Sequence, residues 1–309
     1  KELCLKSKGY ENWEIHDRIG IGKKKETKIL NISKNSVSSS ILEIKKIHLE
    51  QEPNLRFINK EKINLISLNE LLKKKYGIKS FVLYDDNLFA MRKQAKELLR
   101  QMVDRKLNLK WHVSSFAIFV IDDEMLDLMA AAGCIGVNVA IESGNPRVLK
   151  EIINKPIKDL YAVPKLISGI KKRGMYVLAN FIIGNPGETW EEIRETINFA
   201  ENCGADYVKF FIAVPLQGTD MYEMARKLNA FEQDHEADNP KLDWRFSQLK
   251  SDEWTSKDVS ILRVYEWDRI NFAPDRIERT AEIWGVPVDK LSQIRQDTRR
   301  ALQAEAMNA

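Results

Sequence analysis

Short apolar runs alternate with amphipathic segments along most of the chain. The apolar runs are rich in β-branched and aromatic residues and predict strands, whereas apolar positions spaced three or four apart predict helices. The predicted strands are Ile29–Ile32, Ser80–Tyr84, Lys110–Ile118, Ile135–Ile141, Met175–Ile183 and Tyr207–Val214. The predicted helices are Ile63–Tyr76, Arg92–Lys106, Asp122–Ala132, Ala162–Arg173 and Trp190–Asn202, most of them followed closely by a glycine.

This alternation predicts a parallel sheet with right-handed crossovers, either an open doubly wound sheet or a (β/α) barrel. A dinucleotide fold would place a glycine fingerprint directly after the first strand. Gly20 and Gly22 instead precede that strand and are followed by lysines. Six strand–helix units favour an α/β fold of the partial (β/α)6 TIM-like barrel type, over residues 29–230.

The pattern changes on both sides of the barrel. Residues 1–28 are expected to be a linker from an upstream domain, because the sequence starts without a methionine. Residues 231–309 are expected to form a C-terminal helical extension. Its segment from Lys257 to Ala309 predicts two or three helices, broken at Pro274 and at Gly285–Pro287.

Composition narrows the class of protein. The 309 residues are 44% hydrophobic, which allows a sizeable core. No apolar run reaches the roughly 18–20 residues that span a bilayer, and the charged start is unlike a secretory signal, so we expect a cytoplasmic protein without a membrane span. The net charge is +4, and no aromatic residues interleave the lysine runs, so we expect no nucleic-acid partner.

The three cysteines, Cys4, Cys134 and Cys203, lie far apart in the sequence. This spacing argues against a disulfide framework and against a contiguous C-x-x-C metal site.

Polar residues follow several predicted strands at the point where each strand ends. Taken singly, each cluster is also ordinary turn or helix-cap chemistry. Parallel strands bring their carboxyl ends to the same mouth, so together the clusters favour a ligand site there for a small-molecule substrate. The candidates are Asp85, Asp86, Asn87, Ser115, Glu142, Ser143, Asn180, Gly184 and Gln217.

Four stretches in order carry a family resemblance. They read KKKYGIKSFVLYDDNLF, AGCIGVNVAIESGNPRVLKEIINK, FIIGNPGETWEEIRETINFA and AVPLQGTDMYEMA. They resemble the signature stretches of the radical S-adenosylmethionine (radical SAM) superfamily, in particular the branch associated with cobalamin-binding domains. The resemblance covers about Ile29 to Ala230, and the tail is similar to the helical extensions of that branch.

The resemblance implies S-adenosylmethionine (SAM) as cofactor. Asp85, Asp86 and Asn87 would hold its amino end, and Glu142 with Ser143 would meet its ribose or methionine part. Ile182 to Gly184 would run along the adenine, while Gln217 would line the same mouth. The implied reaction is methylation or rearrangement of an unactivated carbon, with cobalamin supplied by a domain upstream of Lys1.

The family's [4Fe–4S] cluster is held by C-x-x-x-C-x-x-C after the first strand, and thiolate is the ligand it requires. Residues 35–43 here contain no cysteine. Ser36, Ser40 and Glu43 keep the spacing, whereas Ser39 and Leu42 fit the following residues better. We therefore expect that this chain cannot make the radical, and that it needs a redox partner only if a cluster forms.

Other interpretations stay open at this stage. The chain could be a radical SAM enzyme whose loop was lost or altered, or a cluster-free barrel that binds SAM or a nucleotide-like ligand as a binding module or scaffold. A metal-free lyase or aldolase would need a Schiff-base lysine such as Lys209, and it ranks last.

Overall fold

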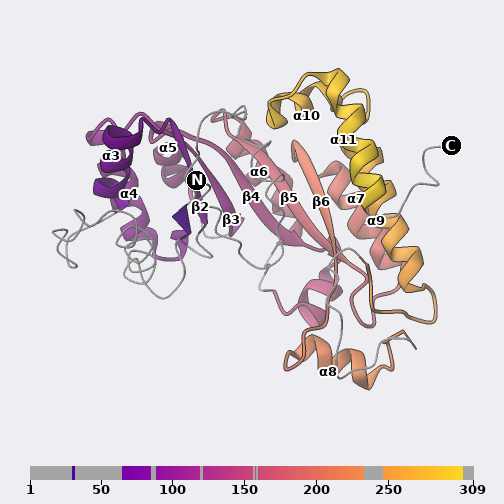
Figure 1. Ribbon diagram of the computed structural model, residues 1–309. Helices are drawn as coiled ribbons and strands as arrows, with labels where there is room; N and C mark the ends of the chain where they lie inside the picture. Colours follow the sequence, from indigo (N-terminus) through magenta and orange to yellow (C-terminus); the bar gives the residue numbers. More distant parts are fainter. Residues whose placement is uncertain are drawn as a thin grey trace, which may run out of the picture. The chain divides into compact units, whose positions relative to one another are not determined.

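The computed structural model describes residues 30–31, 65–84, 88–118, 121–155, 157, 159–232 and 246–301. Six strands form one sheet in which the strand order follows the chain order (Figure 1), and the registered pairs are parallel. The strands are β1 (Leu30–Asn31), β2 (Ser80–Tyr84), β3 (Lys110–Phe116), β4 (Cys134–Glu142), β5 (Tyr176–Ile183) and β6 (Tyr207–Ile212).

Helices follow the strands and then continue beyond the sheet. The α-helices are α3 (Leu65–Tyr76), α4 (Arg92–Asp104), α5 (Asp123–Ala131), α6 (Val163–Lys171), α7 (Trp190–Asn202), α8 (Asp220–Lys227), α9 (Ser256–Asn271), α10 (Ile277–Trp284) and α11 (Val288–Ala301). The topology is that of a partial (β/α)6 TIM-like barrel with a C-terminal helical extension, which confirms the predicted fold class.

The sequence predicted most of these elements to within a few residues, and the breaks at Pro274 and Gly285–Pro287 separate three helices as expected. It did not predict α8, nor the short π-helix η5 (Val148–Ile152) after β4. Two short 3-10 helices, η3 (Leu88–Ala90) and η6 (Leu160–Ala162), were also not foreseen. Single turns carry too few apolar positions for periodicity to reveal them.

Helix ends follow the capping chemistry of the sequence. Asp122 accepts a hydrogen bond from the backbone N–H of Met125 and so begins α5. Thr189 and Glu192 form a reciprocal capping box at the start of α7. Gly133 adopts φ +93° between α5 and β4, where a Cβ would lie 2.4 Å from the Leu109 oxygen, so only glycine fits there.

Contacts divide the chain into two compact units. The first comprises Lys1–Val139 and Ser168–Val177. Its described core centres on Trp111, which is fully buried, stacks on Phe81 at 6.1 Å between centroids, and donates its indole N–H to the Ala132 oxygen. This core is built mainly from β2, β3 and the helices α4 and α5.

The second unit comprises Ala140–Ile167 and Leu178–Ala309. Side chains on β5 and β6 alternate between two environments, as strand geometry requires. One face is buried and includes Phe181, Ile183, Val208, Phe210 and Ile212. The opposite face carries Asn180 and Ile182 beside Lys209 and Phe211, which are less buried.

Asn271 of α9 closes the outer edge of β6. It accepts a hydrogen bond from the Val208 N–H and donates to the Val208 oxygen, both at 2.8 Å, as a neighbouring strand would. Since β6 is the last strand in the sheet order, this fully buried amide supplies the pairing that an edge strand lacks. The helical extension is thereby part of the second unit's packing.

Candidate functional site

The carboxyl end of β4 places Glu142 in an unusual backbone conformation. Its φ is +74°, in the left-handed region that few non-glycine residues adopt. Its carboxylate accepts a hydrogen bond from Lys155 Nζ at 2.9 Å through Oε1. Both side chains are partly buried, with 20% of Glu142 and 25% of Lys155 exposed. Such strain persists where the surroundings hold it, and it is common at binding sites.

Lys155 reaches β4 because the segment between them turns back sharply. The π-helix η5 ends at Ile152, and Asn154 then adopts φ +53°. The Lys155 N–H bonds the Leu149 oxygen, six residues earlier, at 2.8 Å, and this bond closes the turn in which Asn154 holds the left-handed position. Lys155 Nζ consequently also donates to the backbone oxygen of Ala140 on β4.

The residues after Glu142 are fixed against α7. The Ser143 hydroxyl is fully buried, lies 2.9 Å from the Thr196 hydroxyl, and accepts from the Asn145 N–H. A Cβ on Gly144 would lie 2.5 Å from the Phe199 Cβ, so only glycine allows this approach. The hydroxyl of Ser143 is therefore used inside the fold, and a contact from Ser143 to a ligand would come through its backbone.

The loop after β5 is organised around the carboxylate of Glu188. This side chain is 1% exposed, and its Oε2 accepts from the backbone N–H of Asn185 at 2.8 Å and from the Asn185 side-chain amide at 3.0 Å. Its Oε1 has no hydrogen-bond partner among the described residues. Burial raises the pKa of Glu188 to about 7, because desolvation disfavours the charged form.

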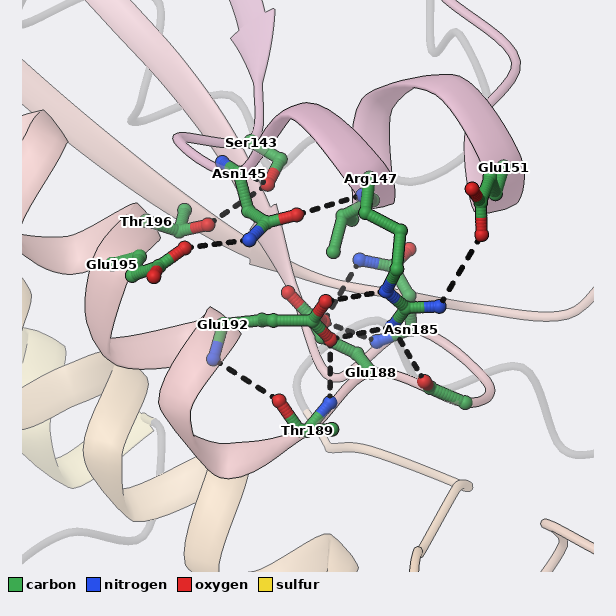
Figure 2. A network of polar contacts seen from close by, with 12 residues as sticks. Ser143, Asn145, Arg147, Glu151, Asn185, Glu188, Thr189, Glu192, Glu195 and Thr196 are labelled. Atoms are coloured by element: carbon green, nitrogen blue, oxygen red, sulfur yellow. Dashed lines mark hydrogen bonds and ion pairs between the residues drawn. The ribbon is translucent and has the colours of Figure 1, made fainter.

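Figure 2 shows how an ion pair joins the segments that follow β4 and β5. The Arg147 guanidinium donates through Nε and Nη2 to both carboxylate oxygens of Glu192, and Nη2 also donates to the Gly187 oxygen at 3.0 Å. This pairing raises the pKa of Arg147 and lowers the pKa of Glu192. Planar bidentate pairs of this kind hold geometry well, so the two strand ends are fixed relative to each other.

Residues of the C-terminal extension contact the loop that follows β5. Trp254 is 2% exposed and donates its indole N–H to the backbone oxygen of Glu188 at 2.9 Å. Val259 of α9 packs on Gly184, whose φ is +75°, so closely that a Cβ there would lie 2.8 Å from Val259 Cγ1. The sequence predicted this loop as a candidate but did not predict what holds it.

The less buried face of β5 offers one polar and one apolar group beside each other. Asn180 and Ile182 share this face, and they pair in register with Lys209 and Phe211 of β6. The Asn180 side-chain oxygen is buried without a hydrogen-bond partner among the described residues. An unpartnered buried amide oxygen is costly, and a ligand that donates to it would remove that cost.

The structure brings part of the predicted site together and leaves part undescribed. Glu142, Ser143, Asn180, Ile182 and Gly184 all lie at or near the carboxyl ends of β4 and β5 in the second unit. Gln217 is exposed in the turn before α8. Ser115 lies in β3, and nothing is described of its side chain. The remaining predicted residues lie outside the described part of the chain: Asp85, Asp86, Asn87, Ser36, Ser39, Ser40 and Glu43.

Sequence reasoning missed Lys155, Arg147, Glu188 and Glu192 as parts of this site. The signal for Glu192 was its place three residues after Thr189, which is the capping-box spacing. The signal for Lys155 was the preceding Asn154, a residue that tolerates the left-handed conformation. Nothing in the linear spacing indicated that Arg147 would reach Glu192, because their contact spans two strand ends.

The described cysteines do not form a metal site. Cys134 begins β4 and Cys203 follows α7, and both are buried free thiols. Burial raises the pKa of Cys134 to about 12, which opposes formation of a thiolate. Within the described ranges, no three His, Cys, Asp or Glu side chains gather as metal ligands. Nor does any helix in that part of the chain have the length and apolar character to cross a membrane.

The chain is an α/β protein with polar groups at the carboxyl ends of parallel strands, where proteins of this class commonly place ligand sites. A family model described as "Radical SAM superfamily" matches residues 44–200, about half of the chain. The chain belongs to the radical SAM superfamily. The matched segment includes β4, β5 and α7 as far as Ala200. It begins at residue 44, directly after the serine-rich segment that ends at Glu43.

Curated relatives include methyltransferases. A cytidylyl-2-hydroxyethylphosphonate methyltransferase from Streptomyces wedmorensis is 38% identical over 157 residues, covering 48% of this chain and 29% of the relative. An uncharacterised methyltransferase from Pyrococcus horikoshii is 35% identical over 155 residues, covering 50% of this chain and 33% of the relative. The chain thus spans about a third or less of the length of these two relatives.

Among solved structures, one similar chain is the radical S-adenosylmethionine methyltransferase TsrM from Kitasatospora setae, with cobalamin and a [4Fe–4S] cluster bound. It is 24% identical, with a TM-score of 0.44, and the match covers 48% of this chain and 30% of that one.

Proposed function

We propose that this chain binds SAM, or a closely related adenosyl ligand, at the carboxyl ends of β4 and β5. The observation that carries the proposal is Glu142, a strained residue at a strand end whose carboxylate uses only Oε1 for Lys155 among the described residues. Its Oε2 is left to accept from the hydroxyls of a ribose, in the way that acidic residues bind ribose in nucleotide sites.

The neighbouring strand supports the same ligand. Ile182 and the backbone of Gly184 offer an apolar surface suited to a purine ring, and Asn180 offers an unpartnered amide oxygen for an N–H donor. An apolar surface with a few placed polar groups is typical of a cofactor site. These residues would hold SAM, which supplies a transferable methyl group and, with a reduced cluster, a 5′-deoxyadenosyl radical.

The residues present do not fit a [4Fe–4S] cluster. The superfamily holds its cluster with three thiolates, and this sequence has Cys4, Cys134 and Cys203 only. Two of these are buried at the amino end of β4 and after α7. Serine oxygens in the segment 35–43 are hard donors of high pKa and do not replace thiolates. We therefore propose that the chain, with this sequence, does not assemble the cluster.

For a form of this barrel that carries the cluster cysteines we propose SAM-dependent methylation, or rearrangement, of an unactivated carbon in a small-molecule substrate. The similarity to methyltransferases supports this choice. Cobalamin would come from an upstream domain, as the branch resemblance implies, and a redox partner would be required only where a cluster forms.

The second candidate is a cluster-free barrel that binds SAM or a nucleotide-like ligand as a binding module or scaffold. The cysteine positions favour it, because the strand-end residues are arranged for a ligand while the thiolates are absent from the serine-rich segment. Both candidates share the adenosyl site, and they differ in whether a cluster ever forms.

Isothermal titration calorimetry tests the shared site. S-adenosylhomocysteine is titrated into the chain without added iron, together with E142Q and the matched control E191Q. Glu191 is exposed in the first turn of α7 and is not among the residues proposed to contact the ligand. We expect binding by the unaltered chain, a loss of about tenfold in E142Q, and no change in E191Q. No heat at concentrations up to about 1 mM would contradict the proposal.

A further inference from the structure

We propose that Lys155 is a positioning residue for the ribose of the adenosyl ligand, because it holds the Glu142 carboxylate in the orientation that leaves Oε2 for two adjacent hydroxyls. The inference rests on the proposed function and deepens it. The sequence did not single out Lys155, although it ends the stretch that runs from Ala132 through β4.

The contacts of Lys155 are directed and leave its ammonium little freedom. Nζ donates to Glu142 Oε1 at 2.9 Å and also to the backbone oxygen of Ala140, two residues earlier on β4. One ammonium therefore bridges the backbone and the side chain of the same strand end. A lysine held by two acceptors fixes a carboxylate better than an exposed lysine, whose flexible stem gives up more freedom on pairing.

The backbone conformation at Glu142 and directly before Lys155 brings the two side chains together. Glu142 has φ +74° at the end of β4, and Asn154 has φ +53° directly before Lys155. Between them lies the π-helix η5, a form that is rare and often found at functional sites. Residues 142–155 thus contain two left-handed residues and a π-helix. Together they return Lys155 to Glu142.

Stability alone does not explain this arrangement. Glu142 keeps its second carboxylate oxygen without a hydrogen bond from the described residues, although the side chain is only 20% exposed. A carboxylate retained only for packing would gain from using both oxygens, as Glu192 does with Arg147. The free Oε2 at a strand end is the group that a ribose diol would use.

The experiment compares two ligands on three variants of the full 309-residue chain. The ligands are S-adenosylhomocysteine and its 2′,3′-dideoxy analogue, which lacks both ribose hydroxyls. The variants are K155M, K155R and the control K150M, which alters an exposed lysine of η5. Affinities come from calorimetry, and far-UV circular dichroism with the melting temperature reports folding.

We expect K155M to weaken S-adenosylhomocysteine about tenfold and to leave the dideoxy analogue within about twofold of the unaltered chain. K155R should recover most of the loss, because a guanidinium can also bridge the two acceptors, and K150M should behave as the unaltered chain. N154G keeps the left-handed conformation before Lys155 and should also bind normally. It shows whether a change in this turn affects folding by itself, which matters if K155M folds poorly.

Equal weakening of both ligands in K155M would overturn the inference, since a residue that only supports the fold affects both alike. Unchanged affinity for S-adenosylhomocysteine in K155M would overturn it as well. Failure of the unaltered chain to bind S-adenosylhomocysteine at all would instead overturn the proposed function, and the inference with it.

Discussion

The carboxylate of Glu188 is buried in the second unit, where it accepts hydrogen bonds from the backbone and side-chain amide groups of Asn185. The nearby Arg147 is engaged with Glu192. Burial raises the pKa of Glu188 from 4.5 to about 7. Since the folded-state pKa lies above the unfolded one, the folded protein binds this proton more tightly. The corresponding stability is fully present below pH 4.5 and is lost as the pH rises through 7.

Replacing Glu188 with glutamine removes this titration while keeping an oxygen that can accept from Asn185. We expect E188Q to gain stability relative to the unaltered chain as the pH rises from 5 to 8, by about 2–3 kcal/mol at most. Denaturant unfolding at several pH values measures the difference. A difference that is constant over this range would show that Glu188 titrates normally.

Gly184 tests how closely the helical extension packs on the β5 loop. Alanine at this position faces both the left-handed φ and the Cγ1 of Val259 at 2.8 Å. Gly218 is the matched control, because its φ is +83° and nothing lies within 4 Å of its added Cβ. We expect G184A to lose about 1–3 kcal/mol more than G218A in thermal or denaturant unfolding. Equal losses would mean that the backbone strain alone matters.

The positions of the candidate residues were partly predictable from the sequence. Glu142 and Gly184 were predicted because they stand directly after apolar strands, and strand ends in parallel sheets converge. Lys155 and Arg147 were not, because their partners are reached through a π-helix turn and across two strand ends. Such contacts depend on tertiary packing and leave no periodic trace in the sequence.

Helix α9 takes the place of a neighbouring strand at the outer edge of β6. Asn271 makes both backbone hydrogen bonds to Val208, and a third to the Trp267 oxygen of its own helix. In N271L the Val208 N–H and oxygen would stay buried and unpaired. We expect a loss of about 2–4 kcal/mol in unfolding free energy, against almost none for N198L, an exposed position on α7. A loss below about 1 kcal/mol would show that water reaches the β6 edge.

Trp254 connects the extension to the loop that would contact the adenine. W254F keeps most of the apolar volume of the side chain but leaves the backbone oxygen of Glu188 without the indole N–H donor. We expect S-adenosylhomocysteine to bind about three- to tenfold more weakly, with a control in W284F, whose ring packs on Tyr207 instead. Calorimetry gives both affinities. Equal affinities in the two variants would show that the Trp254 contact, and with it the extension, does not contribute to ligand binding.

The order of elements was predictable because it is written in the alternation of apolar runs and amphipathic segments, such as the strand Tyr176–Ile183 followed by the helix Trp190–Asn202. The sequence did not predict η5, which shows where prediction from periodicity fails. A π-helix of five residues has no sequence period of its own, and tertiary contacts decide its hydrogen bonding.

The family match indicates a radical SAM barrel, whereas the cysteine positions indicate that its cluster is not held. The chain belongs to the radical SAM superfamily, and the match begins at residue 44. The serine-rich segment before that point lacks the three thiolates that the superfamily uses. We account for both by a barrel that keeps its adenosyl site and lacks the ligands of its cluster.

Anaerobic reconstitution with iron and sulfide tests this account most directly. The unaltered chain is compared with S36C/S40C/E43C and N35C/S39C/L42C, the two placements of the cluster spacing. Iron content and visible absorbance are measured after desalting. We expect a colourless unaltered chain with little iron, and about four irons per chain with brown colour in one variant. Uptake of about four irons by the unaltered chain would contradict the account, as would failure of both variants.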